Sequence, residues 1–155
     1  MTIVRRLKSP DIAEMQAANR LFADVFGEEG YHGPPAGREH LEKLLADEKF
    51  IALVAHVDGE MAGAIAAYEL VKFEAERSEV YIYDLAVAAA HRREGVATAL
   101  IEQLQRIAAT RGAYVIFVQA DTDVDDQPAI ALYTKLGRRE DVLHFDIAVP
   151  GGDAA

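Results

Sequence analysis

The chain has 155 residues, 51% of them hydrophobic and none of them cysteine, and it carries a formal net charge of −10 at pH 7. This length and composition favour a single domain, residues 1–155, and exclude a disordered polyelectrolyte, a disulfide framework and a cysteine nucleophile. The excess of acidic residues disfavours nucleic acid and anionic membranes as partners and favours polycationic small molecules. The alternative is that the acidic surface only keeps the protein soluble.

The first half of the chain predicts a strand, two helices and a β-hairpin. Apolar residues recur at helical spacing in the first helix, and Asp58-Gly59 is a strong two-residue hairpin signal. Neither a membrane-spanning run nor the apolar centre of a signal peptide is present, so we expect a cytoplasmic protein. The predicted elements are a strand at 2–8, a helix at 11–26, a Gly/Pro-broken loop at 27–37, a helix at 38–47, and strands at 50–57 and 60–73.

The second half predicts an alternation of strands and helices. The whole order, βα(α)βββαβαβ, predicts a mixed central sheet flanked by helices, an α/β fold. The tail from about residue 150 is expected to be frayed. The elements are strands at 78–87, 112–120 and 140–149, the second of them buried, and helices at about 95–111 and 128–137.

The stretch RREGVAT, residues 92–98, stands between a strand and an apolar helix. Free backbone N–H groups at a helix start, with the helix dipole, favour an anion such as phosphate. Gly95 permits close approach of the backbone, and Arg92 and Arg93 add charged donors. A solvated basic loop beside an ordinary helix is the alternative.

The motif RREGVA resembles the pyrophosphate loop Arg/Gln-x-x-Gly-x-Gly/Ala of the GCN5-related N-acetyltransferases (GNAT superfamily), and YIYDLAV and PAIALYTKLG resemble its other motifs. The resemblance implies a GNAT fold in which acetyl-CoA, as co-substrate, lies in a cleft between two splayed parallel strands. The residues implied to hold it are Leu85, Ala86, Val87, Arg92, Arg93, Gly95, Val96, Ala97, Thr98, Ala129 and Tyr133.

A longer match, from Phe50 to near Ile147, resembles the aminoglycoside 3-N-acetyltransferases of the gentamicin-modifying type. It implies acetyl transfer to the 3-amino group of an aminoglycoside, a reaction that confers antibiotic resistance. An aminoglycoside carries several ammonium groups, which suits an acidic protein. A homodimer is compatible with the fold, and no metal site is expected.

Three residues are catalytic candidates. The resemblance places Tyr133 beside the CoA sulfur, where its hydroxyl can act as general acid, although a helix-face tyrosine can also simply pack the core. Asp84 alternates onto the face of Val80 and Ile82, where a carboxylate needs a partner such as a substrate ammonium; a bulge or a basic neighbour would remove that need. His32, in the broken loop, titrates near neutral pH and is a candidate base or a bystander.

Further carboxylates are substrate-binding candidates. The run DTDVDD follows the strand at 112–120 and can present several acids to a polyamine sugar, or be a solvated loop. Other amines, such as a polyamine or a protein N-terminus, and a non-catalytic acetyl-CoA sensor remain alternative functions. The substrate-binding candidates are Glu79, Tyr83, Asp84, Asp121, Asp123, Asp125, Asp126 and Asp146.

Overall fold

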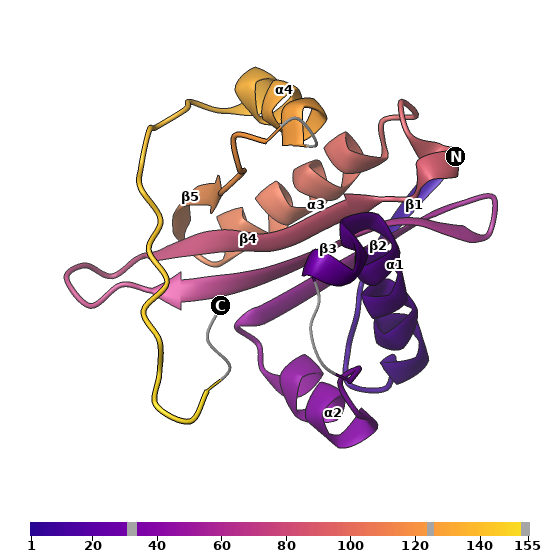
Figure 1. Cartoon of the computed structure of the whole chain (residues 1–155), viewed down its shortest axis with the longest axis horizontal. Coiled ribbons are helices and arrows are strands. Elements are labelled where there is room, and N and C mark those ends of the chain that lie inside the picture. Colours follow the sequence, from indigo (N-terminus) through magenta and orange to yellow (C-terminus); the bar gives the residue numbers. More distant parts are fainter. Residues whose placement is uncertain (31–33, 124–125, 153–155) are drawn as a thin grey trace. The chain divides into compact units, whose positions relative to one another are not determined.

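Five strands form one mixed sheet in residues 1–119: β1 (Thr2–Arg6), β2 (Phe50–Val57), β3 (Glu60–Val71), β4 (Ser78–Val87) and β5 (Ala113–Val118), in that order across the sheet (Figure 1). The pairs β1/β2, β2/β3 and β3/β4 are antiparallel, whereas the pair β4/β5 is parallel. The computed structural model describes residues 1–30, 34–123 and 126–152. It divides into two compact units, 1–119 and 120–155, and the expectation of one domain stays a prediction.

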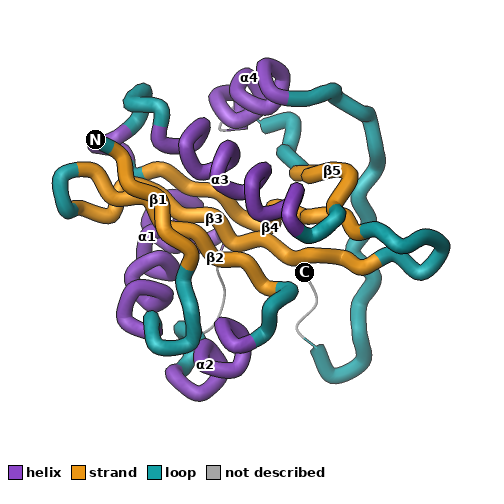
Figure 2. Tube along the Cα trace, turned by 180° about the vertical axis from the view of Figure 1, so that it is seen from behind, coloured by secondary structure: helices purple, strands orange, loops and turns teal. Residues whose placement is uncertain are grey.

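Helices cover both faces of this sheet. The predicted helices are confirmed as α1 (Ile12–Gly30), α2 (Arg38–Ala46) and α3 (Val96–Thr110), and a short 3-10 turn, η1 (Ala89–His91), precedes α3. Helix α1 extends past the predicted end at residue 26, across a kink at Gly27, whose φ of 72° is not helical. The two opposite views show α1 and α2 on one face and α3 on the other (Figures 1 and 2). The fold of this unit is therefore a mixed α/β sandwich of three layers.

The core follows from the alternation of side chains along the central strands. Phe50, Ala52 and Val54 of β2 belong to the cluster formed with α1 and α2. The residues between them, such as Leu53, are also fully buried and face α3. Burial on both faces explains why β2 is an almost unbroken apolar run, each large side chain of which stabilises the fold by about 1.5–3 kcal/mol.

The hairpin predicted between β2 and β3 is confirmed. Asp58 and Gly59 both have positive φ angles, 51° and 83°, as a two-residue type I′ turn requires. The turn places Glu60 at the start of β3, next to the end of β4 and η1, where Ala88 N–H donates to the Ala62 carbonyl at 2.8 Å.

The described part of the second unit contains one helix, α4 (Gln127–Leu136), with a proline in its first turn. Its end is closed by the Gly137 N–H, which donates to the Tyr133 carbonyl at 2.8 Å. The strand predicted at 140–149 is wrong: the described structure gives this segment no strand, and Leu143 and Ile147 are more than 80% exposed. Apolar alternation alone predicted it, but a strand also needs a paired neighbour.

The strand predicted at 112–120 is present as β5, but it is not buried. It lies at the end of the strand order, and Tyr114 and Val115 are 49% and 39% exposed. Among the described residues, no helix combines the length and apolar character that crossing a membrane requires.

Candidate active site

The two parallel strands part half-way along β4. They are paired from Ser78 opposite Ala113 to Ile82 opposite Val118, where β5 ends. Beyond that point β4 stays paired with β3 as far as Val87, and its other edge has no strand neighbour within the described ranges. The N–H and C=O groups of Leu85–Val87 that point away from β3 can therefore pair with an extended ligand that carries amide groups.

A β-bulge at Tyr83 decides which way the site carboxylate points. Asp84 lies opposite Ala66 and Ile82 lies opposite Ala67, which leaves Tyr83 as the extra residue of β4. The bulge reverses the alternation, so the half-buried Asp84 faces α1 and α2 and does not share a face with Ile82. Simple alternation along the strand predicted Asp84 on the face of Ile82, with a bulge as the alternative; the bulge is present.

A row of aromatic rings crosses the same face of the sheet. Neighbouring ring centroids lie between 4.7 and 6.2 Å apart. Tyr81 and Phe117 are stacked, whereas Tyr83 is edge-on to both Tyr68 and Tyr81. The sequence pointed to Tyr83 but missed most of the row, because the pairing of the strands, which the sequence does not contain, brings the rings together. In order, the rings are Phe50, Tyr68, Tyr83, Tyr81 and Phe117.

Asp84 influences the neighbouring phenols. Burial raises the pKa of Tyr68 and of Tyr81, and the charges of Tyr83 and Asp84 raise it further. Both hydroxyls therefore stay protonated at neutral pH and remain hydrogen-bond donors. One carboxylate beside neutral aromatic faces suits an ammonium group carried on a ring, since it offers ion pairing and cation–π contact together.

Residues 92–95, which we call the arginine loop, follow directly after β4 and η1. Gly95 precedes α3 with φ of 79°, in the left-handed region, and nothing lies within 4 Å of the position a Cβ would take. The N–H groups of Val96, Ala97 and Thr98 have no intrahelical acceptor because they begin the helix. The N-cap residue, Gly95, has no side chain that could accept a hydrogen bond from them.

Arg92 and Arg93 are exposed, and the described structure pairs neither guanidinium with a carboxylate. Two uncommitted cations, open space above a glycine and uncapped helix amides together fit a pyrophosphate.

Gly63 on β3 holds the start of α3 close to the sheet. A Cβ at this position would lie 2.8 Å from Val96 Cγ1, 3.1 Å from Leu100 Cδ1 and 3.0 Å from the Ala86 carbonyl oxygen. Val96 and Leu100 are fully buried and cannot easily move.

Gly63→Ala is therefore expected to displace the first turn of α3 and to lower the free energy of unfolding by about 1–3 kcal/mol. Thermal unfolding measures the loss of stability, and calorimetric titration with acetyl-CoA, the ligand that the sequence resemblance implies, measures the effect at the start of α3. Gly37→Ala controls for an added methyl, which meets nothing within 4 Å there; because Gly37 is the N-cap of α2, where alanine is less favourable than glycine, the two variants are compared on acetyl-CoA affinity, which Gly37→Ala should leave unchanged. Equal behaviour of the two variants would refute the packing argument.

Glu79 is already engaged by other residues. Its carboxylate accepts a hydrogen bond from the Tyr114 hydroxyl and lies 3.7 Å from Lys72 Nζ. Five residues of extended chain separate it from Asp84, a distance of about 16 Å along the strand. The structure thus groups Glu79 with the β3–β4 turn and not with Asp84.

In the second unit, Asp126 precedes α4, and its carboxylate accepts the Asp121 N–H at 2.8 Å. The Asp123 carbonyl accepts the Asp126 N–H at 3.1 Å, so these acids shape one loop. Asp146 is exposed and pairs with His144 at 2.9 Å. Tyr133 and Ala129 are half-buried on α4. The predicted site residues His32 and Asp125 lie outside the described residues.

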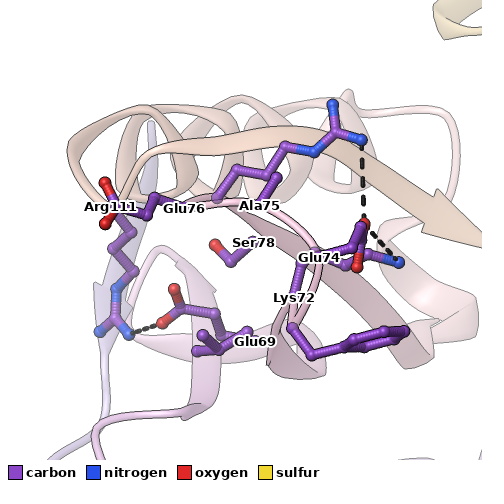
Figure 3. A pocket seen from close by; sticks show the side chains of 10 residues that line it. Glu69, Lys72, Glu74, Ala75, Glu76, Ser78 and Arg111 are labelled. Atoms are coloured by element: carbon purple, nitrogen blue, oxygen red, sulfur yellow. Dashed lines mark hydrogen bonds and ion pairs between the residues drawn. The ribbon is translucent and has the colours of Figure 1, made fainter.

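A cavity of about 600 Å³ lies at the β3–β4 turn and not at the arginine loop (Figure 3). Its charged groups satisfy one another: Arg111 Nη1 donates to Glu69 at 2.8 Å, and Glu74 pairs with Lys72 and Arg77. Burial alone would raise the pKa of Glu69, but hydrogen bonds from Arg111 and Ser78 and the charges of Arg111 and Lys49 together lower the pKa.

A smaller cavity, about 300 Å³, lies beside the arginine loop. It is lined by Leu21, Asp24 and Val25 of α1 together with Ala88, Ala89 and Arg92. No sequence signal points to Asp24, because an acidic residue on an amphipathic helix is ordinarily a surface residue. Among the described residues, no group of three His, Cys, Asp or Glu side chains could hold a metal ion.

Comparison with known proteins identifies the type of fold. A profile of the acetyltransferase (GNAT) family matches residues 15–137. An aminoglycoside acetyltransferase from an uncultured soil metagenomic sample is 55% identical, with a TM-score of 0.92 over 96% of this chain and 99% of that chain. A second one from such a sample, solved in complex with sisomicin, is 30% identical with a TM-score of 0.86 over 96% of each chain.

A ribosomal-protein-alanine N-acetyltransferase from Brucella melitensis biovar Abortus 2308 is 23% identical, with a TM-score of 0.74 over 96% of this chain and 99% of that chain. At this identity the likeness shows the shared fold alone. No curated protein matches the chain.

Proposed function

The chain belongs to the GNAT acetyltransferase family, and we propose that it transfers the acetyl group of acetyl-CoA to the 3-amino group of an aminoglycoside antibiotic. The observation that carries the choice of acceptor is the half-buried Asp84 beside a row of aromatic rings, on the sheet face next to the parting strands. The 55% identity to an aminoglycoside acetyltransferase supports the same substrate class. The net charge of −10 also favours a polycationic acceptor.

The binding of acetyl-CoA is proposed from the same part of the fold. Backbone groups of Leu85–Val87 that point away from β3 suit the amide groups of the pantetheine arm, and the start of α3 suits the pyrophosphate. Arg92 and Arg93 supply charge-assisted hydrogen bonds to the phosphate oxygens.

The mechanism follows from what the chain offers. When bound, acetyl-CoA would supply a thioester, whose C–S bond breaks after the acceptor nitrogen has formed the new C–N bond. Asp84 binds the acceptor ammonium and accepts its proton, directly or through water. N–H groups within Leu85–Val87 donate hydrogen bonds to the oxygen that becomes negative. From the resemblance of ALYTKLG, we assign to Tyr133 the proton that the departing thiolate needs.

Two other functions remain to be separated from this one. The fold is shared with a protein N-acetyltransferase, so it does not by itself select the acceptor. A sensor that binds acetyl-CoA without turnover would use the arginine loop but not Asp84 or Tyr133.

Release of CoA thiol from acetyl-CoA distinguishes these functions when gentamicin, kanamycin, spermidine and a peptide with a free N-terminus are compared as acceptors. We expect release with gentamicin, and NMR of the product should place the acetyl group on the 3-amino nitrogen. Release with spermidine or the peptide alone would overturn the acceptor. Tight acetyl-CoA binding without release would support the sensor.

A further inference from the structure

His91 lies between two carboxylates that come from separate segments of the chain. Its Nε2 is 3.1 Å from Glu60 Oε2, at the start of β3, and its Nδ1 is 3.0 Å from Glu94 Oε2, in the arginine loop. The imidazole is only 14% exposed. The side chain therefore ties the loop that follows β4 to the hairpin between β2 and β3.

Both contacts can be hydrogen bonds at once only when His91 is protonated. A carboxylate accepts and does not donate, so two carboxylates need two N–H donors, and a neutral imidazole has one. Hydrogen bonds to Glu94 and then Glu60 raise the pKa of His91 above its ordinary value of 6.5, and the charges of the same two groups act in the same direction. The other charged groups of this loop are Arg92 and Arg93.

The loop needs such a tie because its backbone is unfavourable. Arg93 has φ of 65°, in the left-handed region that residues with a Cβ rarely adopt, and Gly95 follows with φ of 79°. Within the described structure, the contact through Glu94 is the one side-chain hydrogen bond made by residues 92–95. Without the hydrogen bond of Glu94, only the backbone connections to η1 and to the start of α3 would keep the loop in position.

We propose that His91 is a positioning residue, which in its protonated form clamps Glu94 to Glu60 and so holds Arg92, Arg93 and Gly95 in place for the pyrophosphate of acetyl-CoA. This inference rests on the proposed function of the arginine loop. His91 needs no contact with acetyl-CoA, because it acts through Glu94 on the backbone of the loop.

A clamp and a direct effect of charge predict opposite results for Glu94→Gln. This substitution removes a negative charge near the phosphate site, so charge alone would tighten acetyl-CoA binding. The clamp predicts weaker binding, by about three- to tenfold, because the tie loses a charge-assisted hydrogen bond. Glu60→Gln should act in the same direction, since Glu60 holds the other end.

The experiment is calorimetric titration of wild type, His91→Asn, Glu94→Gln and the control His40→Asn with acetyl-CoA, and with S-acetylpantetheine, which lacks the phosphates. His40 is an exposed histidine on α2. We expect His91→Asn and Glu94→Gln to weaken acetyl-CoA binding about three- to tenfold and to leave S-acetylpantetheine unchanged. Equal loss for both ligands would mean a general structural role and would overturn the proposal, as would tighter binding by Glu94→Gln.

The pH dependence gives a second readout. The tie is complete below pH 6.5 and is lost as the pH rises through the raised pKa of His91 in the folded protein. Between pH 7 and 9, where a phosphate monoester is already doubly ionised, wild-type affinity for acetyl-CoA should therefore fall and that of His91→Asn should stay flat. Parallel profiles would overturn the clamp.

Arg92→Ala separates this inference from the proposed function. Normal acetyl-CoA affinity in Arg92→Ala would reject the phosphate role of the loop itself. A strong loss in Arg92→Ala with no loss in His91→Asn would keep that role and reject the clamp. An NMR titration of His91 checks the tie without any ligand, because Glu94→Gln should bring its pKa back towards 6.5.

Discussion

Asp84→Asn is expected to lower kcat/KM for an aminoglycoside about a hundredfold, while the KM for acetyl-CoA stays the same. The substitution keeps the size of the side chain and its place after the bulge, so packing against Ala66 is preserved. It removes the negative charge that we assign to the acceptor ammonium and its proton. Steady-state kinetics with gentamicin, over a range of both substrates, measures the effect.

The form of the loss shows what Asp84 does. If the carboxylate accepts the proton, kcat falls and the acidic limb of its pH profile disappears, because an amide does not titrate. If the carboxylate only binds the ammonium, KM rises at an unchanged kcat. Normal values of both constants would remove Asp84 from the site.

Glu79→Gln is the matched control for this change. Glu79 lies on the same strand but is held by Tyr114 and Lys72, and it is about five residues of extended chain away. We expect less than about a threefold change in kcat/KM, since exposed or already paired carboxylates contribute little at a distance. If Glu79→Gln lowered kcat/KM as much as Asp84→Asn does, the effect would not be specific to Asp84, and the acceptor site would have to include Glu79.

The sequence predicted the fold of residues 1–119 well because local and tertiary preferences agree there. The Asp58-Gly59 turn sets the β2–β3 pairing next to it, up to the register shift between Ala55 and His56. Apolar runs such as 50–57 can be satisfied only inside a sheet covered on both faces. The segment at 140–149 shows the limit of the same method. Its alternation is as regular as that of β4, yet the described structure gives it no paired neighbour.

The candidate site was predictable where it is continuous in the chain and not where strands assemble it. The arginine loop needs only residues 92–98, whose order alone indicates an anion site. The face on which Asp84 lies depends on one bulge at Tyr83, and a bulge has no clear sequence signal. The tie between His91 and Glu60 joins residues that are 31 positions apart, so a pattern of neighbouring residues could not indicate it.

Tyr133→Phe is expected to lower kcat about a hundredfold with little change in acetyl-CoA affinity. A thiolate leaves a tetrahedral centre faster when a donor protonates it, and phenylalanine cannot donate. The ring remains and the α4 backbone is unaffected, because the Gly137 N–H binds the carbonyl of residue 133 and not its side chain. Stopped-flow thiol release and calorimetric titration measure the two quantities.

Tyr114→Phe is the control for this substitution, because it also removes one phenol hydroxyl. The hydrogen bond to Glu79, and to a smaller extent burial, raise the pKa of Tyr114, so its hydroxyl stays protonated over the working pH range. Because this hydroxyl is paired with Glu79 and has no assigned role in the reaction, its loss should leave kcat within about threefold. A drop in kcat confined to Tyr133→Phe, together with the loss of the alkaline limb of the pH profile, would support a general acid. Normal turnover in Tyr133→Phe would assign the proton to water or to another group, and normal acetyl-CoA binding without turnover in the wild type would leave only the sensor.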